Sequence, residues 1–237
     1  MAQREQTIVP LLFRSVNVYA VRGKRTVLVD TGTPGMADAI LAGLAKLGVR
    51  EEEIGLILLT HGHPDHAGSA AELKQRLGVP LAIHRDEAHW LRAGRSEGTP
   101  IPVRPLGYLL KPLVKPEFPA CEPDILLEEG QRLDDYGLDA RLLHTPGHSP
   151  GSLSFLFPNG DCIAGDVMAG GFVRENRPDY PFFLDDRAIL HQSIARLVAE
   201  VPGRLYFGHG QPADAASVRR RFAGPLAQLV REGRIAS

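Results

Sequence analysis

The stretch Thr60-His61-Gly62-His63-Pro64-Asp65-His66-Ala67-Gly68 places four potential metal ligands within six residues. The apolar run at 57–59 is typical of a buried strand, and residues 70–77 have the pattern of a helix. Gly62 and Pro64 interrupt regular structure at this connection, so that neighbouring side chains can converge. Imidazoles and carboxylates are the ligand types that zinc and related metals accept. The spacing therefore predicts a metal site rather than a solvated polar loop.

Composition points to one globular domain with a substantial core. The chain has 237 residues, of which 43% are hydrophobic. The formal net charge is -1, from 27 basic and 28 acidic residues, and like charges do not form blocks. We therefore expect no nucleic-acid partner and no membrane partner.

Cysteine count and the distribution of apolar residues bear on where in the cell we expect the protein. The two cysteines are too few for a disulfide framework, and the first six residues are polar rather than signal-like. No run reaches the roughly 20 apolar residues of a membrane-spanning helix. We expect a cytoplasmic protein with a single domain over residues 1–237. The oligomeric state stays open, with a homodimer as one option.

The first hundred residues alternate between strand and helix patterns, which is typical of an α/β fold. Strands are expected at 7–21 and 25–29, with a hairpin turn at 22–25. A helix is expected at 36–47, where Gly48 provides the stop. Asp30 follows the second of these strands. It is either a turn or capping residue, or a carboxylate that orients a ligand histidine.

Residues 94–124 differ from the rest because they are rich in proline and show no clear secondary structure. Loops of this length are often lids or binding loops, although a linker between two halves is the alternative. Apolar side chains within the segment, such as Tyr108, argue against a fully solvated linker. We expect an insertion that packs over a pocket.

The second half of the chain brings further candidate ligands to strand ends. His148 follows the strand expected at 138–143, Asp166 follows a hairpin at 153–164, and His209 follows the strand at 204–207. A helix is expected at 186–200, and one or two helices, broken at 224–225, at 212–234. Seven candidate ligands are too many for one tetrahedral zinc and suit two metals with a shared carboxylate. The candidates are His61, His63, Asp65, His66, His148, Asp166 and His209.

These motifs, in this order, resemble the metallo-β-lactamase superfamily, on its glyoxalase II-like side. The matching pieces are residues 28–32, 60–68, 145–152, 164–166 and 208–210. The resemblance implies a four-layer αββα sandwich of two mixed sheets with flanking helices. It also implies that His61, His63 and His148 hold one metal, while Asp65, His66 and His209 hold the other and Asp166 bridges them. Asp30 then becomes a buried supporting residue.

Several features of this sequence depart from the patterns of particular branches of the superfamily, and these differences argue against some candidate functions. An aspartate at the place of Asp166 is unusual in true β-lactamases of this superfamily. The short segment after His209 leaves little room for the C-terminal helical domain of glyoxalase II proteins. Related lactonases often carry a tyrosine where Ala169 stands. No dedicated nucleic-acid domain is evident.

The resulting hypothesis is a metal-dependent hydrolase in which a dinuclear, metal-bound hydroxide attacks a small ester, thioester or lactone. The cofactors are two divalent ions, with zinc preferred and iron or manganese as alternatives. Asp65 is a candidate proton acceptor. The alternatives are a mononuclear iron enzyme resembling the persulfide dioxygenases, and a non-catalytic binding protein on the same fold. Aromatic residues are candidates for the pocket of a small-molecule substrate, with core packing as the other interpretation. They are Tyr108, Phe172, Tyr180, Phe182 and Phe183.

Overall fold

The computed structural model describes residues 6–13, 15–98, 101–103 and 105–234 of the chain. The chain forms two compact units, each with its own mixed β-sheet. The first unit consists of Met1–Glu97 and Lys115–Leu142, and the second of Gly98–Val114 and Leu143–Ser237. The single domain over residues 1–237 stays a prediction.

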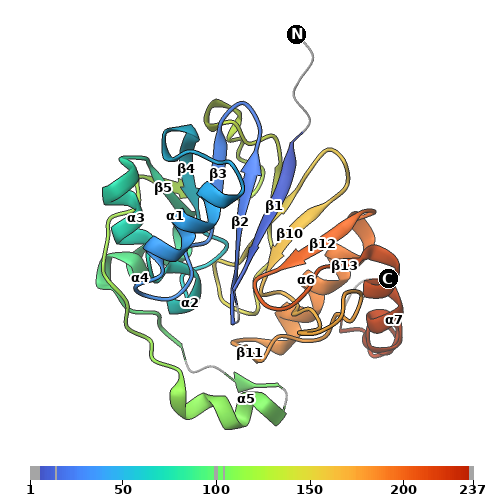
Figure 1. Cartoon of the computed structure of the whole chain (residues 1–237). Coiled ribbons are helices and arrows are strands. Elements are labelled where there is room, and N and C mark those ends of the chain that lie inside the picture. The colour runs from blue at the N-terminus through green and yellow to red at the C-terminus, as the bar shows by residue number, and fades with distance from the viewer. Residues whose placement is uncertain (1–5, 14, 99–100, 104, 235–237) are drawn as a thin grey trace. The chain divides into compact units, whose positions relative to one another are not determined.

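The sheet of the first unit combines an antiparallel and a parallel half (Figure 1). In sheet order its strands are β1 (Thr7–Leu12), β2 (Asn17–Arg22), β3 (Thr26–Val29), β4 (Ile54–Leu58), β5 (Leu81–His84) and β7 (Ile125–Leu127). Strands β1, β2 and β3 are antiparallel neighbours, and the expected hairpin turn joins β2 to β3. The steps from β3 to β4, β5 and β7 are parallel. Every residue of β3 and β4 is buried, as apolar strands inside a parallel sheet require.

Helices of the first unit follow the parallel strands in the α/β alternation that the sequence predicts. They are α1 (Ala37–Lys46), α2 (Pro64–Ala67), α3 (Ala70–Leu77) and α4 (Ala88–Ala93), with short 3-10 turns η1 (Glu51–Glu53), η2 (Arg85–Glu87) and η4 (Asp134–Tyr136). Ile40 and Leu44 of α1 and Leu73 of α3 are fully or almost fully buried, and they belong to one hydrophobic cluster with the strands. Burial of these apolar stripes holds the helices on the sheet.

The second unit is built around another mixed sheet. Its order is β13 (Ala213–Asp214), β12 (Arg204–Phe207), β10 (Cys162–Gly165), β9 (Leu153–Leu156) and β8 (Arg141–His144). Strands β10 and β12 are parallel, whereas β9 and β13 pair antiparallel with their neighbours β10 and β12. A small antiparallel pair joins β6 (Ile101–Pro102) to β11 (Phe183–Leu184).

Two longer helices cover apolar residues of this second sheet. Helix α6 (Arg187–Glu200) begins after Asp186, whose carboxylate accepts hydrogen bonds from the first-turn amides of Ala188 and Ile189. Helix α7 (Ala215–Arg231) continues through Pro225, so the predicted break at 224–225 is wrong. Buried side chains on both sides of Pro225, including Phe222 and Leu229, keep the helix packed across that point.

The expectation of an irregular segment at 94–124 is also wrong in part. The segment contains β6, helix α5 (Pro105–Leu110) and the 3-10 turn η3 (Lys111–Leu113). Proline stands at the first position of α5, where the missing N–H costs nothing, and the sequence pattern did not reveal this. Residues 98–114 belong to the second unit, and the flanking residues belong to the first. A lid function stays a prediction.

The predicted fold class is confirmed by the two mixed sheets and the helices that accompany each of them. Within the residues that the structure describes, no helix combines the length and the apolar composition needed to span a bilayer.

Candidate metal centre

Adjacent parallel strands bring the first candidate cluster together. Strand β3 ends at Val29 and its parallel neighbour β4 ends at Leu58, so the residues that follow lie at the same sheet edge. The backbone N–H of Asp30 donates to the carbonyl of Leu58 at 2.9 Å, which extends the ladder by one residue. Asp30 and the histidine loop are therefore neighbours because of the sheet register.

Asp30 is fully buried and adopts a left-handed backbone with a φ of 64°. Its carboxylate accepts hydrogen bonds from the Thr60 N–H at 2.8 Å and from the Thr60 hydroxyl at 2.8 Å. A third bond comes from His66 Nδ1, at 2.9 Å from Oδ2. The structure thus places Asp30 where a carboxylate that orients a ligand histidine would stand.

The same network fixes the His61 ring. Thr60 has one hydroxyl hydrogen, and it is donated to Asp30. The hydroxyl oxygen therefore accepts from His61 Nδ1, which lies 3.0 Å away. With Nδ1 of both His61 and His66 acting as donor, Nε2 is the lone-pair nitrogen of each neutral ring and the atom that can ligate a metal.

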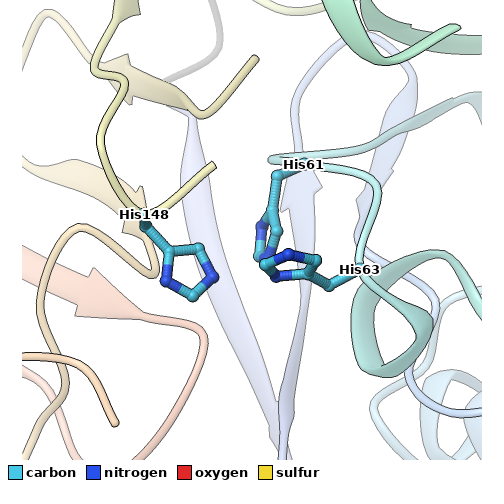
Figure 2. A group of neighbouring side chains, drawn as sticks. All are labelled: His61, His63 and His148. Carbon is cyan, nitrogen blue, oxygen red and sulfur yellow. The ribbon is translucent and has the colours of Figure 1, made fainter. Parts of the chain in front are cut away.

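A short helical turn carries the remaining residues of this loop. Helix α2 starts at Pro64, and the backbone N–H of His66 donates to the carbonyl of His63 at 2.9 Å. The His61 and His63 rings meet edge to face with centroids 4.7 Å apart (Figure 2). The Asp65 side chain is 40% exposed, and its Oδ2 lies 3.9 Å from His66 Nε2. His61, His63, Asp65 and His66 each offer an atom that could ligate a metal ion.

A second cluster forms by the same rule in the second unit. Parallel strands β10 and β12 end side by side, and the Gly208 N–H donates to the Gly165 carbonyl at 2.9 Å. Asp166 and His209 come next along the chain, and His209 Nε2 lies 3.1 Å from Asp166 Oδ2. Both side chains are largely buried, with 7% of Asp166 and 13% of His209 exposed. The structure therefore brings these two predicted ligands together.

His148 lies in the loop after β8 and belongs to this second cluster. Figure 2 shows its ring. Its Nδ1 donates to the Phe183 carbonyl at 3.0 Å, and its Nε2 lies 3.7 Å from Asp166 Oδ2. Gly147 precedes it with a φ of +117°, and a Cβ there would approach the Leu190 amide nitrogen to 2.3 Å. Glycine is therefore required for the chain to pass α6 and present the imidazole.

The donor sets of both clusters fit divalent metal ions. His61, His66 and His148 each have Nδ1 engaged by an oxygen acceptor, so each can present Nε2. This arrangement is typical of metal-bound histidines, whose second nitrogen donates to a protein oxygen. Imidazole and carboxylate ligands suit zinc, iron and manganese.

The predicted pocket aromatics occupy different environments in the second unit. Tyr108 of α5 is 67% exposed, and Phe172 is 48% exposed with its ring 5.6 Å from that of Phe182. The Phe182 ring lies 6.4 Å from His209. Tyr180 instead contacts helices α6 and α7, and Phe183 contributes the carbonyl that holds His148. A role of these side chains in substrate binding stays a prediction.

Sequence reasoning missed three residues that support the first cluster. Thr60 was visible only as part of the motif, although its hydroxyl links Asp30 to His61. Glu87 accepts the Gly62 N–H, and Trp90 stacks on His63 with centroids 5.8 Å apart. The available signal was the position of Glu87 just after β5, the parallel neighbour of β4.

Comparison with known proteins identifies the family. The sequence model of the metallo-beta-lactamase superfamily matches residues 11–209, which is most of the chain. The chain belongs to the metallo-β-lactamase superfamily. The resemblance inferred from the motifs is thereby confirmed.

Relatives within the metallo-β-lactamase superfamily include several metallo-hydrolases. The chain is 32% identical to a probable metallo-hydrolase, MJ0888, of Methanocaldococcus jannaschii, with 84% of this chain and 90% of the relative covered. It is 30% identical to hydroxyacylglutathione hydrolase GloC of Haemophilus influenzae, with 67% of each chain covered. Membership of this superfamily supports a hydrolase with divalent metal ions.

A solved structure of the metallo-β-lactamase superfamily shares the fold and carries metal. The protein TTHA1623, solved in a di-iron-bound form, aligns with a TM-score of 0.65 at 29% identity. The alignment covers 91% of this chain and 97% of that one. The fold of the chain is therefore that of the superfamily.

Replacement of Asp30 tests the network that orients two histidines. We expect Asp30→Asn and Asp30→Ala to weaken zinc binding by about 10-fold to 100-fold, because alanine removes the acceptor that His66 and Thr60 share and asparagine replaces one of its two oxygens with an NH2 donor. Loss of this buried acceptor should also lower the free energy of unfolding by about 1–3 kcal/mol for each donor that alanine leaves unsatisfied. Urea unfolding and zinc titration against a chromophoric chelator measure both effects. The control is Asp38→Asn, whose side chain is 88% exposed, and wild-type zinc affinity in both Asp30 variants would contradict the assignment.

Asp185 provides a test of pH dependence near the start of α6. Burial raises the pKa of its carboxyl from 3.8 to about 6. A raised carboxyl pKa means that the folded state favours the protonated form, so stability is lost as pH rises from 3.8 through 6. Because Asp185→Asn cannot ionise, we expect it to exceed wild type in stability at pH 7–8 and to approach wild type near pH 4.

The measurement for Asp185 is the denaturant midpoint of metal-free protein in chelator at several pH values. Asp134 provides a control of opposite sign, because its hydrogen bond with Arg132 lowers the pKa of the Asp134 carboxyl. Asp134→Asn should therefore be less stable than wild type above pH 3.8. A constant difference between Asp185→Asn and wild type at every pH would refute the prediction.

Proposed function

We propose that this chain is a dinuclear metal-dependent hydrolase, on the glyoxalase II-like side of its superfamily, that cleaves a small ester, thioester or lactone. The observation that carries the proposal is that His61, His66 and His148 each bond a protein oxygen through Nδ1, which makes Nε2 the lone-pair nitrogen of each neutral ring. Superfamily membership supports the hydrolase class. The name of the Haemophilus influenzae relative, hydroxyacylglutathione hydrolase, supports an acyl substrate.

The proposed ligand sets divide the two clusters between two ions. As proposed, His61, His63 and His148 would hold the first ion, and Asp65, His66 and His209 would hold the second. Asp166 would be the shared carboxylate, because both His148 and His209 approach its Oδ2 within the second unit. Zinc is the preferred ion, and the di-iron form of TTHA1623 makes iron the main alternative.

Two bound divalent ions would supply an acidified water as nucleophile and would polarise the substrate carbonyl. The chain itself then has two tasks. Asp30 and Thr60 hold His61 and His66 in one orientation and one tautomer, so little reorganisation is needed during turnover. Asp65, which is 40% exposed at the start of α2, is placed to accept a proton and pass it to solvent.

The primary experiment combines metal quantification with a substrate screen. Protein purified without added metal is analysed for zinc, iron and manganese, and then assayed with p-nitrophenyl acetate, an acyl thioester and a lactone. We expect about two ions per chain and hydrolysis of at least one compound. Fully metallated protein that hydrolyses none of them would remove the proposal. One iron per chain together with oxygen consumption would replace it with an oxygenase.

Substitution of one ligand links the metal to the activity. We expect His61→Ala to lose metal and to lower kcat/KM by at least about 100-fold, because one proposed ion loses a ligand. His89→Ala is the matched control, since the His89 side chain is 53% exposed and contacts Glu97. Metal content is measured by mass spectrometry on the same samples that are assayed. A normal turnover rate in His61→Ala would count against the ligand assignment.

A further inference from the structure

The loop that carries His61 and His63 rests on a buried carboxylate from another part of the first unit. Glu87 ends the 3-10 turn η2, just after β5, and its side chain is fully buried. Its Oε2 accepts the backbone N–H of Gly62 at 2.5 Å. The bond is made to the residue between two candidate ligands, so it acts directly on their spacing.

The indole of Trp90 completes the support beneath the same loop. Trp90 is 3% exposed, and its ring lies nearly parallel to that of His63, at 14° with centroids 5.8 Å apart. A Cβ on Gly62 would lie 3.1 Å from Trp90 Cε3 and 3.2 Å from Glu87 Oε2. The backbone at Gly62 is therefore fitted closely against both side chains.

A fully buried carboxyl group is costly unless its polar atoms are hydrogen-bonded. Glu87 lies in the turn directly after β5, the strand next to β4, so sheet register brings its carboxyl group to the edge where the ligand loop begins. The hydrogen bond from the Gly62 N–H to this carboxyl therefore anchors the loop on the segment that follows β5.

We propose that Glu87 is a positioning residue for the metal centre, which sets the geometry of His61 and His63 through Gly62. The proposal rests on the proposed function only in requiring that this loop holds a metal. Glu87 acts through the backbone and touches neither substrate nor reacting atoms.

The test measures zinc and cobalt binding in two variants of Glu87. Glu87→Gln keeps the size but replaces one of the two oxygens with an NH2 donor, and Glu87→Leu removes both oxygens. We expect the zinc dissociation constant to rise by about 10-fold in the first variant and by up to about 100-fold in the second. The visible spectrum of the cobalt-substituted protein should change in both, because the ligand geometry changes.

Glu97→Gln is the matched control, since its side chain is 64% exposed and lies in the same unit. It should bind zinc as wild type does. Circular dichroism and unfolding in chelator establish that each variant is folded, and if Glu87→Leu does not fold, Glu87→Gln decides. Folded Glu87 variants with wild-type zinc affinity and cobalt spectrum would overturn the proposal, even if their unfolding midpoints fall.

The readout separates this proposal from the proposed hydrolase function. Zinc affinity is measured without substrate, so a chain that binds zinc but hydrolyses no test compound would refute the function and leave the role of Glu87 intact. Wild-type protein that binds neither zinc nor cobalt would refute both proposals. If the protein is active but its Glu87 variants bind zinc with wild-type affinity, only the positioning role is refuted.

Discussion

The hydrogen bonds of the Asp30 carboxylate are the constraint on which the first cluster depends. One buried side chain accepts from Thr60 and His66, and through Thr60 it also sets the His61 ring. The residue holds a left-handed backbone to do so, a conformation that costs about 1–3 kcal/mol for a residue other than glycine. Aspartate tolerates this conformation better than most residues, since its short side chain can bond locally.

Both clusters obey the same topological rule. In each unit two parallel strands end at the same edge of the sheet, and polar residues follow them there. The strand pairs are β3 with β4 and β10 with β12. The strands themselves are apolar and buried, so the polar residues begin where the ladder stops. In each segment the buried strand residues therefore stabilise the fold, and the polar residues directly after them supply the candidate ligands.

Much of this arrangement was readable from the sequence because it depends on local patterns. Buried apolar runs located β3, β4, β10 and β12, and histidine or aspartate directly after them located the candidate ligands. Asp30 could not be resolved in this way, because a turn residue and a supporting carboxylate look alike in a sequence. The partner that distinguishes them, His66, is brought close only by the pairing of β3 with β4.

Other features depend on tertiary contacts that no local pattern encodes. Proline content predicted irregular structure at 94–124, but Pro105 starts a helix there and residues 101–102 pair with β11. The same bias predicted a break at Pro225, where burial of the flanking residues keeps α7 continuous. Glu87 looked like an ordinary polar residue of a short helix, since its partner Gly62 is 25 residues away.

The interleaved course of the chain through its two units has a consequence for biosynthesis. Residues 98–114 belong to the second unit, yet the first unit is complete only with residues up to Leu142. Translation as far as Leu142 supplies the whole first unit together with residues 98–114 of the second, so synthesis of the second unit begins before the first is complete. His209, which follows β12, is translated after every other proposed ligand. The nascent protein therefore cannot assemble the full proposed ion-binding set until residue 209 has been added.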